Sequence, residues 1–149
     1  MSIKIQLHYS KALDLELIEK NIEIWLRRIT VQVSFKKSHT WSQPYEAIID
    51  TGAPVSIIPP AIWQEIEKEI LHEEHKIQGI VPDKDSYLSV KIANIFCVLM
   101  DEKNMTEILK IKAYLPVEAK APLVLGFENV LSKGKLYINS KDNEAYIEI

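Results

Sequence analysis

The sequence predicts a single, mostly β domain with one clear helix. Residues 29–35 alternate apolar and polar side chains, as a strand with one buried face does. Several further short apolar runs are separated by polar turn residues, and only one stretch has helical spacing. The chain has 149 residues, of which 47% are hydrophobic and 26% charged, so it can form one core but is too short for a second full domain.

The expected strands are short and follow one another in an antiparallel meander. Residues 122–126 form a fully apolar strand that ends at a glycine, and the chain finishes in a hairpin around residues 140–143. Besides 29–35, the expected strands are residues 45–49, 55–58, 76–80, 88–92, 95–100, 108–115, 122–126, 136–138 and 145–149.

A helix is expected from residue 60 to about residue 71. Pro59 and Pro60 suit the first helical turn, and one apolar face follows from Ile62, Trp63, Ile66 and Ile70. A single helical turn is also expected at residues 127–131. Residues 1–28 fit both a period of two and a helical period, so the sequence leaves them open as an N-terminal extension before a domain at 29–149.

Charge and composition exclude several classes of partner. The net charge is −3, and the basic residues are spread along the chain, which argues against a nucleic-acid partner. No apolar run approaches the ~20 residues that span a bilayer, and the first residues do not resemble a targeting peptide, so a cytoplasmic protein without membrane contact is expected. The single cysteine, Cys97, lies in an apolar run and is expected in the core.

Asp50 is the residue that most needs an explanation. It stands between the apolar runs 47–49 and 55–58, where we expect it to be buried or nearly so, and burial of an unpaired charge is costly. A second copy of Asp50 beside the first would remove the difficulty, because two adjacent carboxyl groups can share one proton. The ionised member could then activate water while the protonated member donates to a carbonyl oxygen.

The residues after Asp50 suit such a site. The Thr51 hydroxyl can form a hydrogen bond across a tight turn, Gly52 allows two backbones to approach, and Ser56 can bond within the loop. The alternative is an ordinary turn, because Asp and Gly both favour turns.

Two motifs together resemble the retropepsin-like aspartic proteases, the retroviral protease family and its cellular relatives. Asp50-Thr51-Gly52-Ala53, with Ser56 in the same loop, is similar to their active-site loop. The later Val124-Leu125-Gly126, followed by a short helix at 127–131, is similar to the strand that crosses behind that loop. The resemblance covers residues 29–149. It implies a closed or partly open retropepsin-like acid-protease barrel with one or two short helices and one active-site aspartate per subunit.

The resemblance also assigns roles to residues. It implies no cofactor and no metal, an aspartic endopeptidase activity, and a flap at residues 78–87 that closes over substrate. The catalytic residues are Asp50, Thr51 and Gly52. The substrate-binding residues are Ala53, Val55, Gln78, Gly79, Ile80 and Val81, and mainly apolar subsites are expected from Val55, Ile57, Ile80 and Val81. The active-site loop is supported by Ser56, Val124, Leu125 and Gly126.

A homodimer is expected because the chain has only one Asp-Thr-Gly, whereas a dyad needs two. The two-fold axis would pass between two copies of Asp50, and a peptide or protein substrate would bind between the subunits. In retroviral members the chain ends form an intersubunit sheet, which residues 144–149 could form here.

The sequence departs from the retroviral pattern at three places. Pro54 stands where those enzymes commonly carry an acid that holds the substrate backbone, and Phe127 stands where they usually have an arginine in dimer contacts. The flap has one glycine, Gly79, and contains Pro82, which cannot donate a ladder hydrogen bond. These departures keep open a non-catalytic alternative, a dimeric peptide-binding or assembly module that captures an extended peptide by strand addition.

Two other groups of residues are weaker candidates for function. His72 and His75 lie three apart without a third ligand in view, so a solvated surface is favoured over a metal site. Trp25, Trp41 and Trp63 are widely spaced, which favours roles as core or interface residues over a stacking site.

Overall fold

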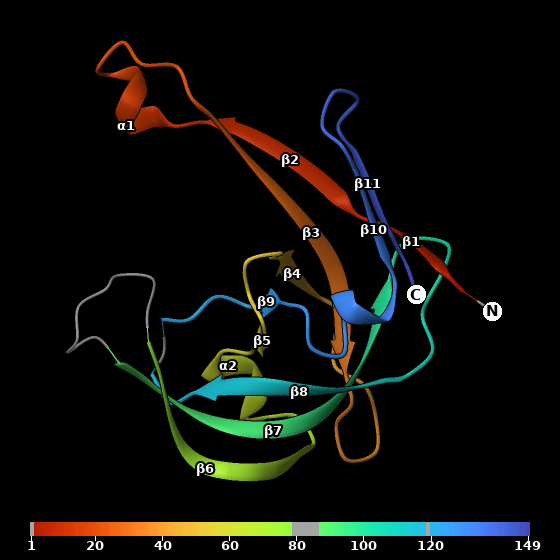
Figure 1. Cartoon of the computed structure of the whole chain (residues 1–149). Coiled ribbons are helices and arrows are strands. Elements are labelled where there is room, and N and C mark those ends of the chain that lie inside the picture. The colour runs from red at the N-terminus through yellow and green to blue at the C-terminus, as the bar shows by residue number, and fades with distance from the viewer. Residues whose placement is uncertain (1, 79–86, 119) are drawn as a thin grey trace.

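The computed structural model describes residues 2–78, 87–118 and 120–149, and its strands form two sheets (Figure 1). The smaller sheet has the order β1-β11-β10, and the larger has the order β2-β3-β4-β9-β5-β8-β7-β6. The strands are β1 (Lys4–Gln6), β2 (His8–Leu13), β3 (Trp25–Phe35), β4 (Tyr45–Ile49), β5 (Ser56–Ile57), β6 (Lys68–Gln78), β7 (Tyr87–Met100), β8 (Leu109–Pro116), β9 (Val124–Leu125), β10 (Lys135–Asn139) and β11 (Glu144–Glu148).

The larger sheet closes on itself through β3. The middle of β3 pairs with β4, with Thr30 opposite Ile48, and the end of β3 pairs with β7, with Phe35 opposite Cys97. Because β3 pairs with both ends of the series β4-β9-β5-β8-β7, the sheet forms a barrel. The predicted mostly β fold is therefore confirmed. The expected antiparallel meander is wrong in part, since β4–β9 and β5–β8 are parallel pairs.

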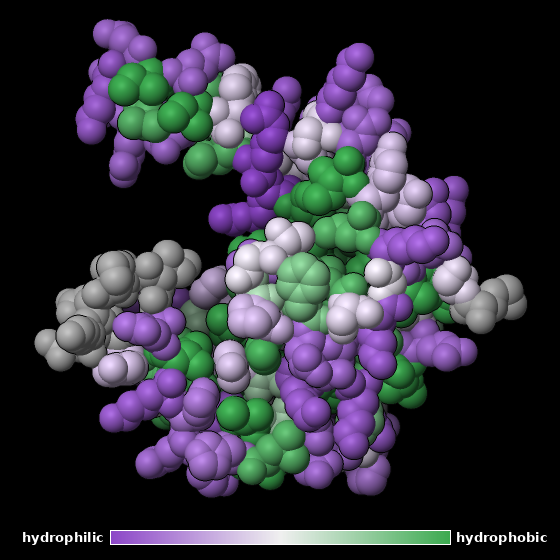
Figure 2. Space-filling view, in the orientation of Figure 1, coloured by the Kyte–Doolittle hydropathy of each residue, from purple (hydrophilic) through white to green (hydrophobic). Residues whose placement is uncertain are grey.

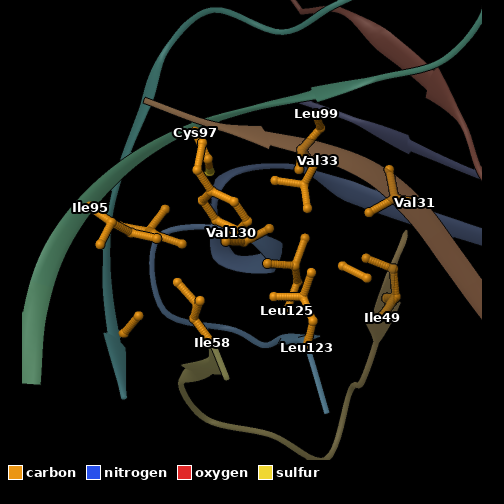
Figure 3. Packing of buried hydrophobic residues seen from close by; sticks show 14 of the residues in the cluster. Val31, Val33, Ile49, Ile58, Ile95, Cys97, Leu99, Leu123, Leu125 and Val130 are labelled. Atoms are coloured by element: carbon orange, nitrogen blue, oxygen red, sulfur yellow. The ribbon is translucent and has the colours of Figure 1, made fainter. Parts of the chain in front are cut away.

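The core fills this barrel with side chains from facing strands (Figure 3). Along β3, Val31, Val33 and Phe35 are buried, as their alternation predicts. Ser34 is also buried, and its hydroxyl donates a hydrogen bond of 2.6 Å to the Ser42 carbonyl, which satisfies its polar group. The labelled members in Figure 3 are Val31, Val33, Ile49, Ile58, Ile95, Cys97, Leu99, Leu123, Leu125 and Val130.

The predicted helix from residue 60 to residue 71 is wrong beyond its first turn. Helix α2 (Pro60–Trp63) has four residues, and β6 begins at Lys68. The chain leaves the helix because the Glu67 N–H donates to the Lys36 carbonyl (2.9 Å) and β6 then pairs along β7. The hydrogen bonds of a long neighbouring strand thus outweigh the helical spacing of the isoleucines.

Other elements refine the sequence-based boundaries. The strands expected at 88–92 and 95–100 are one continuous strand, β7. The helical turn expected at 127–131 is a hydrogen-bonded turn followed by a 3-10 helix at Leu131–Lys133. In the N-terminal segment both periods occur, because the strands β1 and β2 are followed by a short helix α1 (Leu15–Ile18), which precedes β3. The division into 1–28 and 29–149 stays a prediction.

The C-terminal hairpin forms within the chain, as expected, but its last strand is not free to join an intersubunit sheet. Strand β11 pairs with β10 on one edge and with β1 on the other, with Ile147 opposite both Leu136 and Ile5. Since both edges are occupied, residues 144–149 offer no free edge for an intersubunit sheet.

Candidate active site

Asp50 lies at the first position after β4. Ile49, the last residue of the strand, is buried, whereas Asp50 is exposed at the start of the loop that leads to β5. The expectation of a buried acid is therefore wrong for the single chain. The apolar runs on either side enter the barrel wall, but the chain turns out of the sheet at the aspartate, which leaves its carboxylate in solvent.

The loop holds the aspartate carboxylate through a local hydrogen bond. The Gly52 N–H donates to Asp50 Oδ1 (2.8 Å), and the Ala53 N–H donates to the Asp50 carbonyl (3.2 Å). A Cβ on Gly52 would lie 3.2 Å from Asp50 Oδ1, so a larger residue would crowd the carboxylate. Within the described part of the chain, the Thr51 hydroxyl forms no hydrogen bond, and its side chain is exposed.

Strand β9 supports the loop from behind. It runs parallel to β4, with Leu125 opposite Ile49, and the Asp50 N–H donates to the Leu125 carbonyl (3.0 Å). Val124 and Leu125 are buried, and Val124 also pairs with Ile57 in β5. The two strands on either side of the Asp50 loop are thereby joined through one short strand.

Gly126 brings the second motif against the first. Its N–H donates to the buried Ser56 Oγ (3.0 Å), so Ser56 bonds to this motif and not within its own loop. A Cβ on Gly126 would lie 2.4 Å from the Ala53 carbonyl oxygen, closer than real contacts allow. Only glycine therefore permits this approach of the two backbones.

Two further residues in the support of the loop escaped sequence reasoning. The Phe127 N–H donates to the Ala53 carbonyl (3.0 Å), and the Glu128 N–H donates to the Pro54 carbonyl (2.9 Å). These bonds use backbone groups, which every residue type except proline can supply, so the side chains carry no signal. The only sequence signal available was the position of both residues directly after Gly126.

The structure thus gathers most of the predicted site residues into one cluster: Asp50, Thr51, Gly52, Ala53, Ser56, Val124, Leu125 and Gly126. Val55 and Ile57 are partly exposed beside the loop. Gln78 is exposed at the end of β6, and no contact joins it to the Asp50 loop in the described residues. Gly79, Ile80 and Val81, with most of the expected flap, lie outside the described residues.

The cysteine and the two histidines considered as functional candidates do not form a reactive or metal-binding site in the described residues. Burial raises the pKa of the Cys97 thiol to about 12, which keeps it protonated and unreactive. His72 and His75 are exposed on β6, and the described residues contain no cluster of three or more metal-binding side chains. A cavity of about 780 Å³ lies elsewhere, lined by residues that include Gln6, Thr30 and Asp101.

What the cluster can do chemically follows from its one carboxylate. Asp50 is rigidly placed, exposed and oriented by a backbone N–H, so it can accept a proton from a water molecule. A single carboxylate supplies a base but no acid. In the part of the chain that the structure covers, no helix is long and apolar enough to cross a membrane.

Comparisons with known proteins bear on the fold. No family model and no curated protein matches the sequence. Among solved structures, a retropepsin-like aspartic protease from Rickettsia conorii matches with a TM-score of 0.54 and 12% identity, over 99% of this chain and 92% of that one. EIAV protease complexed with the inhibitor HBY-793 matches with a TM-score of 0.41 and 16% identity, over 71% of this chain and 86% of that one. On the strength of the Rickettsia structure, this chain has a retropepsin-like fold.

Proposed function

We propose that the protein is an aspartic endopeptidase that hydrolyses peptide bonds at a dyad formed by Asp50 and Asp50 of the partner subunit in a homodimer. The observation that carries the proposal is the Asp50-Thr51-Gly52 loop, which a retropepsin-like fold holds rigidly through Leu125 and Gly126. Gly52 shapes the turn through its bond to Asp50 Oδ1, while Ser56 and Val124 support the loop from behind.

The dyad would supply both the base and the acid. Two carboxyl groups a few Å apart cannot both ionise, so they share one proton, as aspartic proteases are known to do. The ionised member takes a proton from water, whose oxygen attacks the peptide carbonyl carbon, while the protonated member donates to the carbonyl oxygen. When the tetrahedral intermediate collapses, the C–N bond breaks and the leaving nitrogen takes the proton that the base had removed from water. The other carboxyl regains its proton from a hydroxyl of the intermediate, which becomes the new carboxylic acid, so the dyad again shares one proton.

A second subunit can reach Asp50, because this side chain is exposed in the single chain. An exposed aspartate at the surface of one chain has room for a partner and substrate, and the pair becomes shielded from water only when both are bound. Ala53 and Val55 in the loop, with Ile57 directly after it, would contact the substrate together with the predicted flap residues Gln78, Gly79, Ile80 and Val81. Their mostly apolar character favours apolar side chains next to the cleaved bond.

Pro54 favours a second candidate function, a dimeric peptide-binding or assembly module. It provides no carboxylate to hold a substrate backbone, and its carbonyl already accepts the Glu128 N–H. Such a module would bind an extended peptide without cutting it. A pure binder has no evident need for Asp50-Thr51-Gly52, which is why hydrolysis is the first proposal.

The test is cleavage of a mixed peptide library by the wild type and by Asp50→Asn, from about pH 4 to pH 7, where a shared-proton pair works. Asp142→Asn, in the exposed turn between β10 and β11, is the matched control. We expect wild type and control to cut and Asp50→Asn to be inactive. If no variant cuts although all are dimers that bind library peptides, the binding module replaces the protease.

A further inference from the structure

The chain carries a projecting arm at residues 8–28, which we call the N-terminal arm. It consists of β2, α1 and the first part of β3, with Leu13 opposite Trp25 and Ser10 opposite Arg28. Figure 1 shows it extending away from the barrel, with α1 at its tip. Helix α1 contributes no buried residue, so the tip packs very little against its own chain.

The arm presents a set of large apolar side chains to solvent. Figure 2 shows hydrophobic residues gathered at its end. The set is spread over both faces of the arm, because Trp25 and Leu26 are neighbours in a strand, and its summed apolar area is on the order of 500 Å². The exposed members are Leu15 (75%), Ile18, Ile22, Ile24, Trp25 and Leu26 (54%).

The tip of the arm is ordered by its own hydrogen bonds. Asp14 caps α1 by accepting from the N–H groups of Glu16 and Leu17 (3.1 and 3.3 Å). The Asp14 N–H donates to the Ile24 carbonyl (3.0 Å), and the Ile22 N–H donates to the Leu17 carbonyl (2.9 Å). A surface that is already ordered loses little entropy on binding, which favours a stable interface.

The arm leaves the sheet at the end where Asp50 lies. Strands β3 and β4 are antiparallel with Thr30 opposite Ile48, so residues 25–28 of β3 continue past the last residue of β4. The arm therefore reaches about 10 Å beyond the Asp50 end of β4 before its tip begins. Any molecule that approaches Asp50 from this end comes within reach of the arm.

We infer that the N-terminal arm packs on a second copy of this chain and holds together the dimer that forms the Asp50 dyad. The inference rests on the proposed function, because a single chain has only half of the dyad. Two arms, one from each copy, contribute about 1,000 Å² of apolar surface in total, near the smallest size of a specific interface. The last strand β11 cannot serve instead, since both of its edges are paired within the chain.

Charge also favours a second copy as the partner. The tip, residues 14–23, carries four carboxylates and one lysine, a net charge of −3 that equals the charge of the whole chain. The remainder of the chain is therefore neutral and does not repel the tip. The base of the arm is basic through Lys11, Arg27 and Arg28, so arms that run in opposite directions about a two-fold axis bring opposite charges together.

The test is sedimentation velocity over a range of protein concentrations, with circular dichroism to check the fold. Leu15→Glu with Ile22→Glu removes apolar contacts at the arm, and both side chains are exposed enough to be changed without unfolding the chain. Leu15→Met with Ile22→Val is the conservative control. Ile108→Glu changes an exposed isoleucine outside the arm, and Ile138→Glu tests the exposed face of the terminal hairpin.

We expect the glutamate pair to raise the dimer dissociation constant about tenfold or more, while the conservative pair and Ile108→Glu leave it unchanged. The inference is overturned if the wild type is a monomer, or if the glutamate pair dimerises as the wild type does. In the second case, weaker dimerisation of Ile138→Glu would place the interface at the terminal hairpin instead. The two proposals are separable. If dimerisation depends on the arm but no peptide is cut, the proposed protease activity is wrong and the role of the arm stands. If the arm variants are active and fully dimeric, the role of the arm is wrong and the protease activity stands.

Discussion

At the scale of single residues, Gly126 makes the closest approach in the site. The Ala53 carbonyl oxygen occupies the place of a Cβ, at 2.4 Å. We expect Gly126→Ala to force the Asp50 loop away from β9 and to lower the free energy of unfolding by about 3 kcal/mol, since overpacking of this kind moves backbone.

Urea denaturation measures this effect. Gly52→Ala is the matched comparison, because its Cβ would meet only Asp50 Oδ1, at 3.2 Å. We expect Gly52→Ala to reduce peptide cleavage with a much smaller loss of stability. Equal stability of Gly126→Ala and the wild type would contradict the close approach.

Ser56 is the polar side chain that joins the two motifs. It is fully buried, and its hydroxyl accepts the Gly126 N–H at 3.0 Å. Ser56→Ala leaves a buried N–H without an acceptor, so we expect a loss of about 1–3 kcal/mol in the free energy of unfolding. Thermal and urea unfolding check this, with the exposed Ser132→Ala as a control that should stay within about 0.5 kcal/mol of the wild type.

At the scale of elements, Asp101 ties the first strand to the β7–β8 connection. It accepts the N–H groups of Gln6 (2.7 Å), Lys103 (2.7 Å) and Asn104 (2.6 Å). Burial alone would raise the pKa of this carboxyl, but the three backbone donors and the Lys103 charge outweigh it, and the pKa is lowered. The ionised form is thus favoured in the folded protein.

A lowered pKa gives Asp101 a pH-dependent effect on stability. Its contribution is present above the pKa of the unfolded chain, about 3.9, and is lost as the pH falls through the lower folded value. We expect Asp101→Ala to cost about 1 kcal/mol at pH 7. The difference from the wild type should shrink in urea titrations below about pH 4, and a difference that grows on acidification would contradict the assignment.

Strands with one buried face could be predicted from the sequence, whereas elements set by a distant partner could not. The alternation in β3 is visible because every second side chain enters the core. The spacing of Ile62, Ile66 and Ile70 suits a helix, yet Ile70 belongs to β6, whose hydrogen bonds come from β7. Nothing in residues 60–71 identifies that neighbour, so local spacing led to the wrong element.

The candidate site shows the same division. Asp50, Gly52, Ser56 and Gly126 could be identified because their side chains, or the lack of one, are what the local geometry requires. The backbone hydrogen bonds to the Ala53 and Pro54 carbonyls could not be identified, because they depend on the course of the backbone and not on the side chains. The exposure of Asp50 could not be predicted either, because the apolar residues on both sides indicate burial, whereas the chain turns out of the sheet between them.

At the scale of the whole molecule, the proposed active site belongs to the interface, and this has a consequence for mixed dimers. An Asp50→Asn chain should still fold and dimerise, because the Asp50 side chain bonds only to the Gly52 N–H and asparagine keeps the backbone bond to Leu125. A dimer of one wild-type and one Asp50→Asn chain has a single carboxylate, so it lacks the acid and base pair. Asp50→Asn should therefore inhibit the wild type by exchange of subunits.

We expect a ninefold excess of Asp50→Asn to lower the cleavage rate of a fixed amount of wild type about tenfold once subunits have exchanged, since only about one wild-type chain in ten then has a wild-type partner. The rate is measured on a peptide from the library, present in large excess so that binding to the variant does not deplete it. An enzyme that works as a monomer would keep its full rate under these conditions. Undiminished cleavage in the mixture would thus show that Asp50 acts without its symmetry mate, and the dyad would have to be abandoned even if Asp50→Asn alone is inactive.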